Sequence, residues 1–341
     1  MSVRKARAGM AAALGGGLVA LVHAHDGQSE WTFEMDERQR AREGWAVRRV
    51  AGMGAGVFAL RSFRAGELLF AEAPLLSWPT GLEMTADVLG PTLRELVASL
   101  APGALAQFST LCQEPGKHGD LRSFKGVWQT NALPSRDDGG VSMYANASLI
   151  NHSCRPCLNH TYTEAQSQAL FVVEPMVKRD EQLTIAYISQ PGTREQRRER
   201  LRDAFGFDCA CALCSLEGAS LRQSDVRQRR MVDLEAFIDS STSGGGDRPQ
   251  DEAHVLAAIE EMLSVQKQEG LPITWGQRFM MIAIGLCDRS GNLKAAARWA
   301  WRAQEATRIG GGADSPVFQQ LSVLSKLLSG RAGLAADRYA F

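Results

Sequence analysis

The strongest constraint on the fold is a group of three cysteines within six residues, at Cys209, Cys211 and Cys214. Zinc in structural sites takes four ligands at tetrahedral positions, and close spacing lets one turn supply most of them. Cysteines that only fill a core are not expected to lie so close together along a sequence. A fourth ligand must then come from elsewhere, and Cys154 is the natural candidate. Such a site would fold the segment after residue 205 back over the loop around Cys154.

Cys154 belongs to the segment Asn151–Pro156, which reads Asn-His-Ser-Cys-Arg-Pro. A strand-like stretch at 181–188 follows this segment, and the three clustered cysteines come next. The combination, in this order, resembles the SET domain of protein lysine methyltransferases with its post-SET zinc site. The resemblance covers about residues 47–214 and is best matched to SMYD-type and fungal SET proteins.

An α+β fold is implied, in which a SET-type β-rich domain of short strands carries a helical insertion and a post-SET zinc site. We expect the SET domain at 44–190, its insertion at about 80–125 and the zinc segment at 191–216. The insertion is indicated by leucines at helical spacing between residues 84 and 112. Residues 217–341 are predicted to form an all-α, TPR-like C-terminal domain, because the segment at 291–296 is typical of a paired-helix turn.

The capping-box pair Thr193 and Gln196 predicts a helix that runs to about Ala204, directly before the cysteine cluster.

The resemblance implies S-adenosylmethionine as the methyl donor and assigns its binding to several segments. The glycine turn at 54–56 would approach the amino-acid end of the donor. Asn151 and His152 fall where the family holds the donor, and Phe207 matches an aromatic ring that stacks on adenine. The implied donor-binding residues are Gly54, Ala55, Gly56, Asn131, Asn151, His152, Tyr187 and Phe207; the implied zinc ligands are Cys154, Cys209, Cys211 and Cys214.

Tyr187 matches the active-site tyrosine that lines the lysine channel in this family. A tyrosine hydroxyl can orient the incoming amine and accept weak hydrogen bonds from a polarised methyl group. The sulfonium of the donor already activates the methyl group, and an apolar channel beside a cation lowers the pKa of the lysine. We therefore assign Tyr187 as the catalytic residue and assign no general base. In this interpretation the zinc is structural.

The chain departs from the family pattern in three places, and two of them, Cys157 and Phe205, keep open an alternative hypothesis, a non-catalytic SET-fold module for protein–protein interaction. Cys157 stands where the family usually has asparagine after the Asn-His-Ser-Cys-x-Pro motif. Phe205 stands where close relatives have tyrosine or tryptophan, so a hydroxyl is missing. The region 80–125 has only Cys112 and His118, too few ligands for the MYND zinc module of SMYD proteins.

The charge of the chain is balanced, with 38 basic and 38 acidic residues. This balance argues against direct nucleic-acid binding, which needs a basic face. The basic runs at 194–202 and 222–230 are predicted to be solvated helix faces. The expected partner is a protein that presents a lysine, histone or non-histone, and the chain is expected to be a monomer.

The N-terminal segment 1–26 begins with basic residues, followed by an apolar, glycine-rich run at 10–22. This run is short for a transmembrane helix, so no stable membrane insertion is expected. A cleaved signal peptide, an organelle-targeting peptide and a disordered tail all remain open. The thiolate zinc site and the donor favour the nucleus or cytoplasm over secretion.

Overall fold

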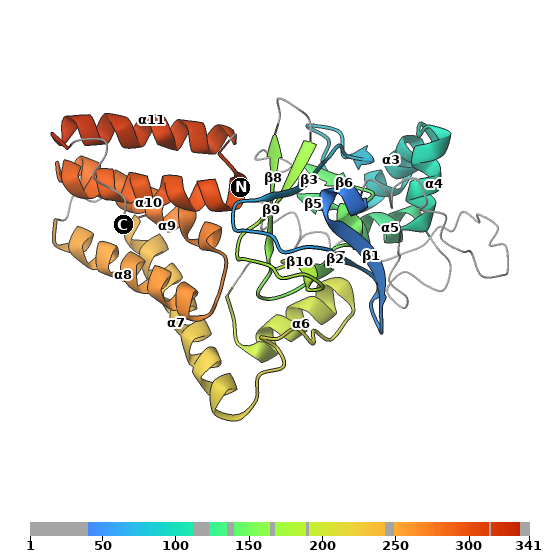
Figure 1. Cartoon of the computed structure of the whole chain (residues 1–341), viewed down its shortest axis with the longest axis horizontal. Helices are drawn as coiled ribbons and strands as arrows, with labels where there is room; N and C mark the ends of the chain where they lie inside the picture. The colour runs from blue at the N-terminus through green and yellow to red at the C-terminus, as the bar shows by residue number, and fades with distance from the viewer. Residues whose placement is uncertain are drawn as a thin grey trace.

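The computed structural model describes residues 40–111, 123–134, 140–163, 168–188, 191–242, 249–313 and 315–334. Within these ranges, small sheets lie between a helical region formed by α3–α5 and a stack of C-terminal helices, α7–α11 (Figure 1). The predictions for residues 1–26, Cys112 and His118 lie outside the described residues.

The first sheet has the strand order β1 (Trp45–Val50), β2 (Gly54–Ala59), β10 (Gln182–Ile185) and β7 (Asn151–His152). β10 pairs with β2 in the antiparallel sense and with β7 in the parallel sense. In the second pairing Thr184 lies opposite Asn151, and Ile185 lies opposite His152. The residues that follow the two strands are thereby brought to one end of the sheet, where the site is built.

Two further sheets complete the β-rich region. One has the order β3 (Leu68–Glu72), β9 (Gln168–Val173) and β8 (Leu158–Thr163); the other has β4 (Leu76–Ser77), β6 (Val141–Met143) and β5 (Leu133–Pro134). Aromatic side chains join the first two sheets into one core, with the ring of Phe70 5.0 Å from that of Trp45 and 4.8 Å from that of Phe171. Such burial of large rings is a main source of core stability.

The helices α3 (Ala86–Ala98), α4 (Pro102–Thr110) and α5 (Phe124–Asn131) lie between β4 and β5 in the chain. They pack over the third sheet around a second core that contains Leu89, Leu93 and the fully buried Trp128. The leucine spacing therefore identified real helices. α5 ends at Asn131, directly beside the site.

The helix α6 (Arg194–Phe205) connects the β-rich region to the C-terminal helices. Thr193 and Gln196 form both hydrogen bonds of a capping box, as predicted. The helix ends at Gly206, whose φ of 74° is the left-handed conformation that favours glycine. The cysteine cluster follows without any intervening element.

The C-terminal helices are α7 (Gly218–Thr242), α8 (Pro249–Gln268), α9 (Gln277–Arg289), α10 (Leu293–Gly311) and α11 (Pro316–Arg331), with the short η2 (Ile273–Gly276) before α9. Buried alanines along α10, including Ala296, Ala300 and Ala303, allow close packing against its neighbours. The predicted α+β fold with a helical C-terminal region is confirmed. Among the described helices, none combines the length and hydropathy needed to cross a bilayer.

Contacts between α10 and the strands β8 and β9 join the C-terminal helices to the β-rich region (Figure 1). The Asn159 side chain donates a 2.8 Å hydrogen bond to the carbonyl of Gly310. A Cβ at Gly310 would lie 1.9 Å from a side-chain carbon of Thr274, so only glycine fits there. Thr274 in turn hydrogen-bonds to the buried carboxyl of Glu174. The two parts of the molecule are therefore packed directly on each other.

Candidate functional site

The four cysteines predicted to share a metal ion come together in the structure. The sulfur atoms of Cys154, Cys209, Cys211 and Cys214 all lie within 4.8 Å of one another. Three of these side chains are buried, and Cys211 is partly exposed. Four thiols converging from two distant segments are a set that suits a tetrahedral metal ion. No other group of three or more metal-binding side chains occurs within the described ranges.

Hydrogen bonds to sulfur surround this cluster. The backbone N–H of Cys154 donates to the Cys211 sulfur, and the guanidinium of Arg197 donates to the Cys214 sulfur at 3.8 Å. A hydrogen bond with Cys154, together with one with Cys209, lowers the pKa of the Cys214 thiol to about 7. Hydrogen bonds with the other three cysteines raise the pKa of the Cys154 thiol, so a metal ion that binds the thiolate would have to displace that proton.

Arg197 corrects one of the sequence predictions. The run at 194–202 was predicted to be a solvated helix face, yet the Arg197 side chain is only 3% exposed. It donates to the carbonyl of Gly192 at 2.5 Å as well as to the cysteine cluster. The physical reason is charge: a thiolate cluster attracts a cation and repays its desolvation. Nothing in the spacing of the basic residues distinguishes Arg197 from the less buried arginines beside it.

His152 connects the cysteine cluster to the aromatic side of the site. The backbone N–H of Tyr187 donates to His152 Nδ1 at 3.0 Å, so this nitrogen acts as the acceptor. In a neutral ring the proton then resides on Nε2, which lies 3.3 Å from the sulfur of Cys154. This is the arrangement by which an outer partner orients a metal ligand. His152 therefore ties β7 and β10 to the cysteine cluster through both ring nitrogens.

Aromatic side chains from two segments surround Tyr187. Its ring centroid lies 5.3 Å from that of His152, 5.0 Å from that of Phe205 and 6.3 Å from that of Phe207. The Tyr187 hydroxyl donates a 2.8 Å hydrogen bond to the carbonyl of Ile150, which fixes the ring. A small pocket opens against Tyr187 and Phe205, and Asn131 and Ile150 are among the residues that line it.

The glycine turn at the start of β2 lies against Asn151. The side chain of Asn151 donates a 2.9 Å hydrogen bond to the carbonyl of Ala55. A Cβ at Gly56 would lie 2.7 Å from the Gln182 amide nitrogen and 2.9 Å from the Asn151 amide nitrogen. Gly54 has a φ of 78°, which again favours glycine. Gly54 is therefore favoured by its backbone conformation, and Gly56 leaves room for the two side-chain amides, which a Cβ would displace.

Cys157, one of the departures from the family pattern, takes part in the same strand connection. The backbone N–H of Thr184 in β10 donates to the Cys157 sulfur at 3.3 Å, and the N–H of Cys157 donates to the carbonyl of Thr184 at 3.2 Å. A thiol can therefore satisfy the β10 amide at this position. The departure does not interrupt the connection between the loop and β10.

A buried carboxyl supports the wall of the pocket. Glu72 accepts hydrogen bonds from the backbone N–H groups of Asn146 and Ala147, at 2.8 and 3.0 Å, and thereby holds the short helix η1 (Ala147–Leu149). Burial raises the pKa of Glu72 to about 7, and these N–H groups oppose the rise. η1 leads directly into Ile150, whose carbonyl holds the Tyr187 hydroxyl. Glu72 thus supports the position of Tyr187 through η1 and Ile150.

Sequence reasoning placed most of these residues but missed others. Asn131, Tyr187 and Phe205 line the same pocket. The glycine turn of β2 contacts Asn151 of β7 across the end of β10, which lies between these two strands. The structure adds Gln182, whose buried amide nitrogen has no hydrogen-bond partner among the described residues. Its backbone pairs with Phe58 of β2 and only its side chain reaches Gly56, a proximity that no pattern in the sequence indicates.

Comparisons with known proteins agree with this geometry. Residues 54–188 match the family model described as SET domain. The chain is 23% identical over 275 residues to "Histone-lysine N-methyltransferase set5" of Schizosaccharomyces pombe, an alignment that covers 80% of this chain and 81% of that protein. It is 38% identical over 96 residues to "Potential protein lysine methyltransferase SET6" of Saccharomyces cerevisiae, which covers 27% of this chain but only 25% of the yeast protein.

The chain is also similar to a solved structure, "Crystal structure of the SET domain of LSMT bound to Lysine and AdoHcy". The two share 14% sequence identity with a TM-score of 0.36, over 87% of this chain and 91% of that one.

Proposed function

We propose that this chain, whose residues 54–188 match a SET domain and which is similar in sequence to lysine methyltransferases, is a SET-domain protein lysine methyltransferase that transfers methyl groups from S-adenosylmethionine to lysine side chains of proteins. The observation that carries the proposal is the junction at β10, where the glycine turn, Asn151 and the ring of Tyr187 lie on segments joined by strand pairing and hydrogen bonds. A non-catalytic interaction module would not need a tyrosine whose hydroxyl is held in place beside a pocket.

The residues beside the glycine turn suit the amino-acid end of the donor. Gly56 leaves a space that a Cβ would fill, with the amide nitrogens of Gln182 and Asn151 beside it. Gln182 has an N–H group without a partner among the described residues, which a carboxylate or carbonyl of a ligand would satisfy. When bound, S-adenosylmethionine supplies a methyl group on a sulfonium, which is transferred in line to the lysine nitrogen as the carbon–sulfur bond breaks.

We assign Tyr187 as the catalytic residue. Its hydroxyl proton is donated to the Ile150 carbonyl, so the oxygen is oriented with its lone pairs available to accept from a polarised methyl group. Phe205 and Ile185 contribute apolar surface to the same pocket. A dry, apolar channel keeps an incoming lysine neutral and therefore nucleophilic. These residues act by positioning and by excluding water.

We further propose that the cysteine cluster holds a structural zinc ion. All four ligand atoms are thiols, which is a donor set that selects zinc over magnesium or calcium. Cys154 lies in the loop after β7, whereas the other three follow α6, so the ion would hold Phe205 and Phe207 against Tyr187. The zinc therefore completes the site without taking part in methyl transfer.

The proposed partner is a protein that presents a lysine. The fission-yeast relative is named as a histone-lysine methyltransferase, so histones are the first substrates to test and peptide arrays follow. We propose that the chain acts as a monomer, without direct contact to nucleic acid.

The first test measures S-adenosylmethionine binding to the full chain by calorimetry. Wild type should bind the donor, and Asn151→Ala should bind at least about tenfold more weakly, because the glycine turn loses its hydrogen bond and an amide donor is lost. Gln319→Ala on α11 is the control, since it changes an exposed side chain far along the chain from the site. Absence of donor binding by folded, zinc-loaded wild type would favour the interaction module.

Replacing Tyr187 with phenylalanine should reduce turnover more than donor affinity. The ring and its contacts with His152 and Phe205 remain, but the oxygen that faces the reacting groups is removed. We expect kcat to fall by about 10- to 100-fold, which is roughly 1.4–2.8 kcal/mol of transition-state stabilisation. Transfer of a labelled methyl group to a substrate peptide would measure it. Equal kcat values in the two proteins would remove Tyr187 from the mechanism.

A further inference from the structure

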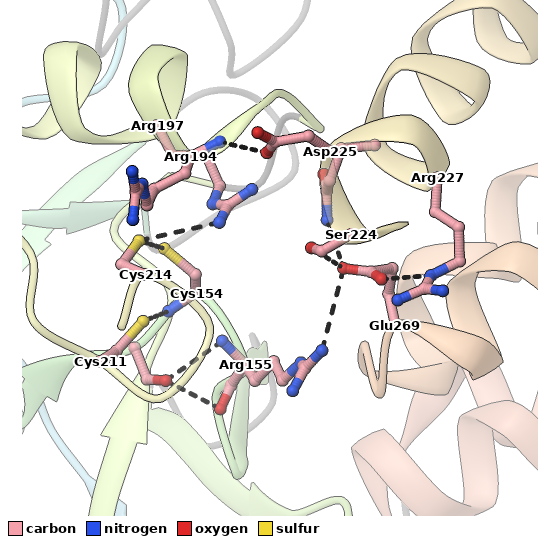
Figure 2. A network of polar contacts seen from close by, with 12 residues as sticks. Cys154, Arg155, Arg194, Arg197, Cys211, Cys214, Ser224, Asp225, Arg227 and Glu269 are labelled. Atoms are coloured by element: carbon pink, nitrogen blue, oxygen red, sulfur yellow. Dashed lines mark hydrogen bonds and ion pairs between the residues drawn. The ribbon is translucent and has the colours of Figure 1, made fainter. Parts of the chain in front are cut away.

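Glu269 is a completely buried carboxylate at the end of α8, far along the chain from the proposed donor site. Its side chain has an exposure of 0%. Ser224 donates to it at 2.8 Å and Gln228 at 3.2 Å, and Arg227 forms an ion pair at 2.5 Å; all three come from α7 (Figure 2). Burying a carboxylate is costly unless its partners replace the lost water. Because the three partners that replace the lost water lie on α7, the buried carboxylate of Glu269 requires α7 to pack on α8.

Glu269 also faces Arg155, which lies in the loop directly after the proposed donor-binding residues Asn151 and His152. In Figure 2 the Arg155 side chain extends from the loop beside Cys154 toward Glu269, and the charged groups lie 3.9 Å apart. Arg155 lies over the turn that follows α8, with its Cδ 3.7 Å from the position a Cβ would take at Gly270. Its buried Nε has no hydrogen-bond partner among the described residues. The carboxylate of Glu269 is therefore the charge that compensates Arg155.

The backbone around Arg155 is bonded to the side chain of Ser153 and, through the Ser153 backbone, to β10. The N–H of Arg155 donates to the Ser153 hydroxyl at 3.1 Å, and this hydroxyl donates to the carbonyl of Arg155 at 2.9 Å. The N–H of Ser153 is bonded to Ile185 of β10. The position of the Arg155 side chain is therefore coupled to the loop between His152 and Cys157, and through this loop to β10.

A second connection leads from Glu269 to the other half of the cysteine cluster. Gln228, which donates to Glu269, accepts from the N–H of Gly192 at 3.0 Å. The carbonyl of Gly192 accepts from Arg197, and Arg197 also donates to the sulfur of Cys214. The carboxylate of Glu269 is thus linked to both segments that supply thiols. Arg155 links it to the segment of Cys154, and Gln228 links it to the segment of Cys214.

We propose that Glu269 is a positioning residue for methyl transfer, by which the C-terminal helices hold the loop 153–157 and the cysteine cluster in the geometry that binds the donor. This proposal rests on the proposed function for its catalytic consequence. Its structural part, that Glu269 orders the loop, holds for the protein without any donor. Glu269 touches neither donor nor lysine and acts only through Arg155 and Gln228.

The experiment compares Glu269→Gln with a matched variant, Glu261→Gln. Both residues lie on or directly after α8 and pair with arginines of α7, but Glu261 is exposed and its carboxylate pairs with Arg230. Hydrogen exchange is followed at the amides of Ser153 and Cys157, which bond to Ile185 and Thr184. We expect roughly tenfold faster exchange in Glu269→Gln and unchanged exchange in Glu261→Gln, because only Glu269 is coupled to the loop.

Donor affinity and kinetics provide the second readout. Glu269→Gln should weaken S-adenosylmethionine binding by about tenfold, near the lower end of typical coupling between sites. Arg155→Gln should weaken binding in the same direction, and the double variant should be no worse than Glu269→Gln alone, since Arg155 acts through its contact with Glu269. The KM for a substrate peptide should change less than kcat. Zinc content and unfolding temperature identify any variant that has failed to fold.

Each outcome separates the two proposals. Loop exchange in Glu269→Gln equal to that in Glu261→Gln would overturn the positioning role, even if wild type proves to be an active methyltransferase. Additive effects of Arg155→Gln and Glu269→Gln would also overturn it. If the wild-type protein binds no donor and the loop amides of Glu269→Gln still exchange faster than those of Glu261→Gln, the role of Glu269 in ordering the loop is supported and the proposed function is rejected.

Discussion

Replacing Cys154 with serine is expected to abolish binding of the proposed zinc ion and with it nearly all of the proposed methyl transfer. Cys154 is the only one of the four clustered cysteines that comes from the loop after β7, so its loss disconnects that loop from the segment after α6. Removing an outer-shell partner of a metal typically weakens binding by roughly 10- to 100-fold, and removal of a ligand should exceed this. Metal content by mass spectrometry and methyl transfer to a peptide measure both effects.

The matched control for this variant is Cys287→Ser. Cys287 is also a buried cysteine, but it lies in α9 within the core of the C-terminal helices. It should keep its zinc and its donor affinity, with only a modest loss of thermal stability. A Cys154→Ser protein that retained stoichiometric zinc would show that the metal site is not the one described here.

Gly56→Ala is the second substitution with a large expected effect. The added Cβ would lie between 2.7 and 2.9 Å from the Gln182 amide, the Val50 side chain and the Asn151 amide, closer than real contacts allow. Overpacking of this kind costs about 1–3 kcal/mol. Because the displaced amides are those proposed to face the donor, we expect its affinity to fall by about a hundredfold, roughly 2.8 kcal/mol. Calorimetric titration with S-adenosylmethionine measures the change.

Gly90→Ala separates this effect from a general intolerance of alanine. Gly90 lies inside α3, and a Cβ there meets no atom within 4 Å. Alanine favours a helix over glycine by about 0.5–1 kcal/mol, so this variant should be slightly stabilised. Normal donor binding by Gly56→Ala would mean that the space beside the glycine turn is not part of the donor site.

The features that were predictable from sequence are those with a strong local signal. The capping box at Thr193 fixes the start of α6, because its two hydrogen bonds involve residues three positions apart. The cysteine set was predictable because thiols at close spacing have few structural alternatives. Asn131 and Tyr187 came from motif resemblance, and the structure brings both to one pocket. The role of each in binding or catalysis stays a prediction.

Residues whose importance depends on distant packing could not be predicted. Arg197 looks like its neighbours in a basic run, and only its proximity to Cys214 makes it a buried cation. Glu269 is one of many acids in an acid-rich helical region, and its partners come from α7 and from the loop of Arg155. The strand β8 was also missed, because its polar residues, including Asn159 and His160, weaken the apolar pattern of a strand.

The double pairing of β10 has a consequence for how the chain acquires its structure during translation. Asn151 bonds to a carbonyl 96 residues earlier, and Cys154 meets the Cys211 sulfur 57 residues later. Contacts with such long sequence separation form slowly, because loop-closure entropy is lost before they are made. As a nascent chain leaves the ribosome, its glycine turn and first strands emerge long before the segments that enclose the site. Glu269 emerges later still, so a chain terminated before Glu269 would contain the strands of the site but lack the residue proposed to support its loop.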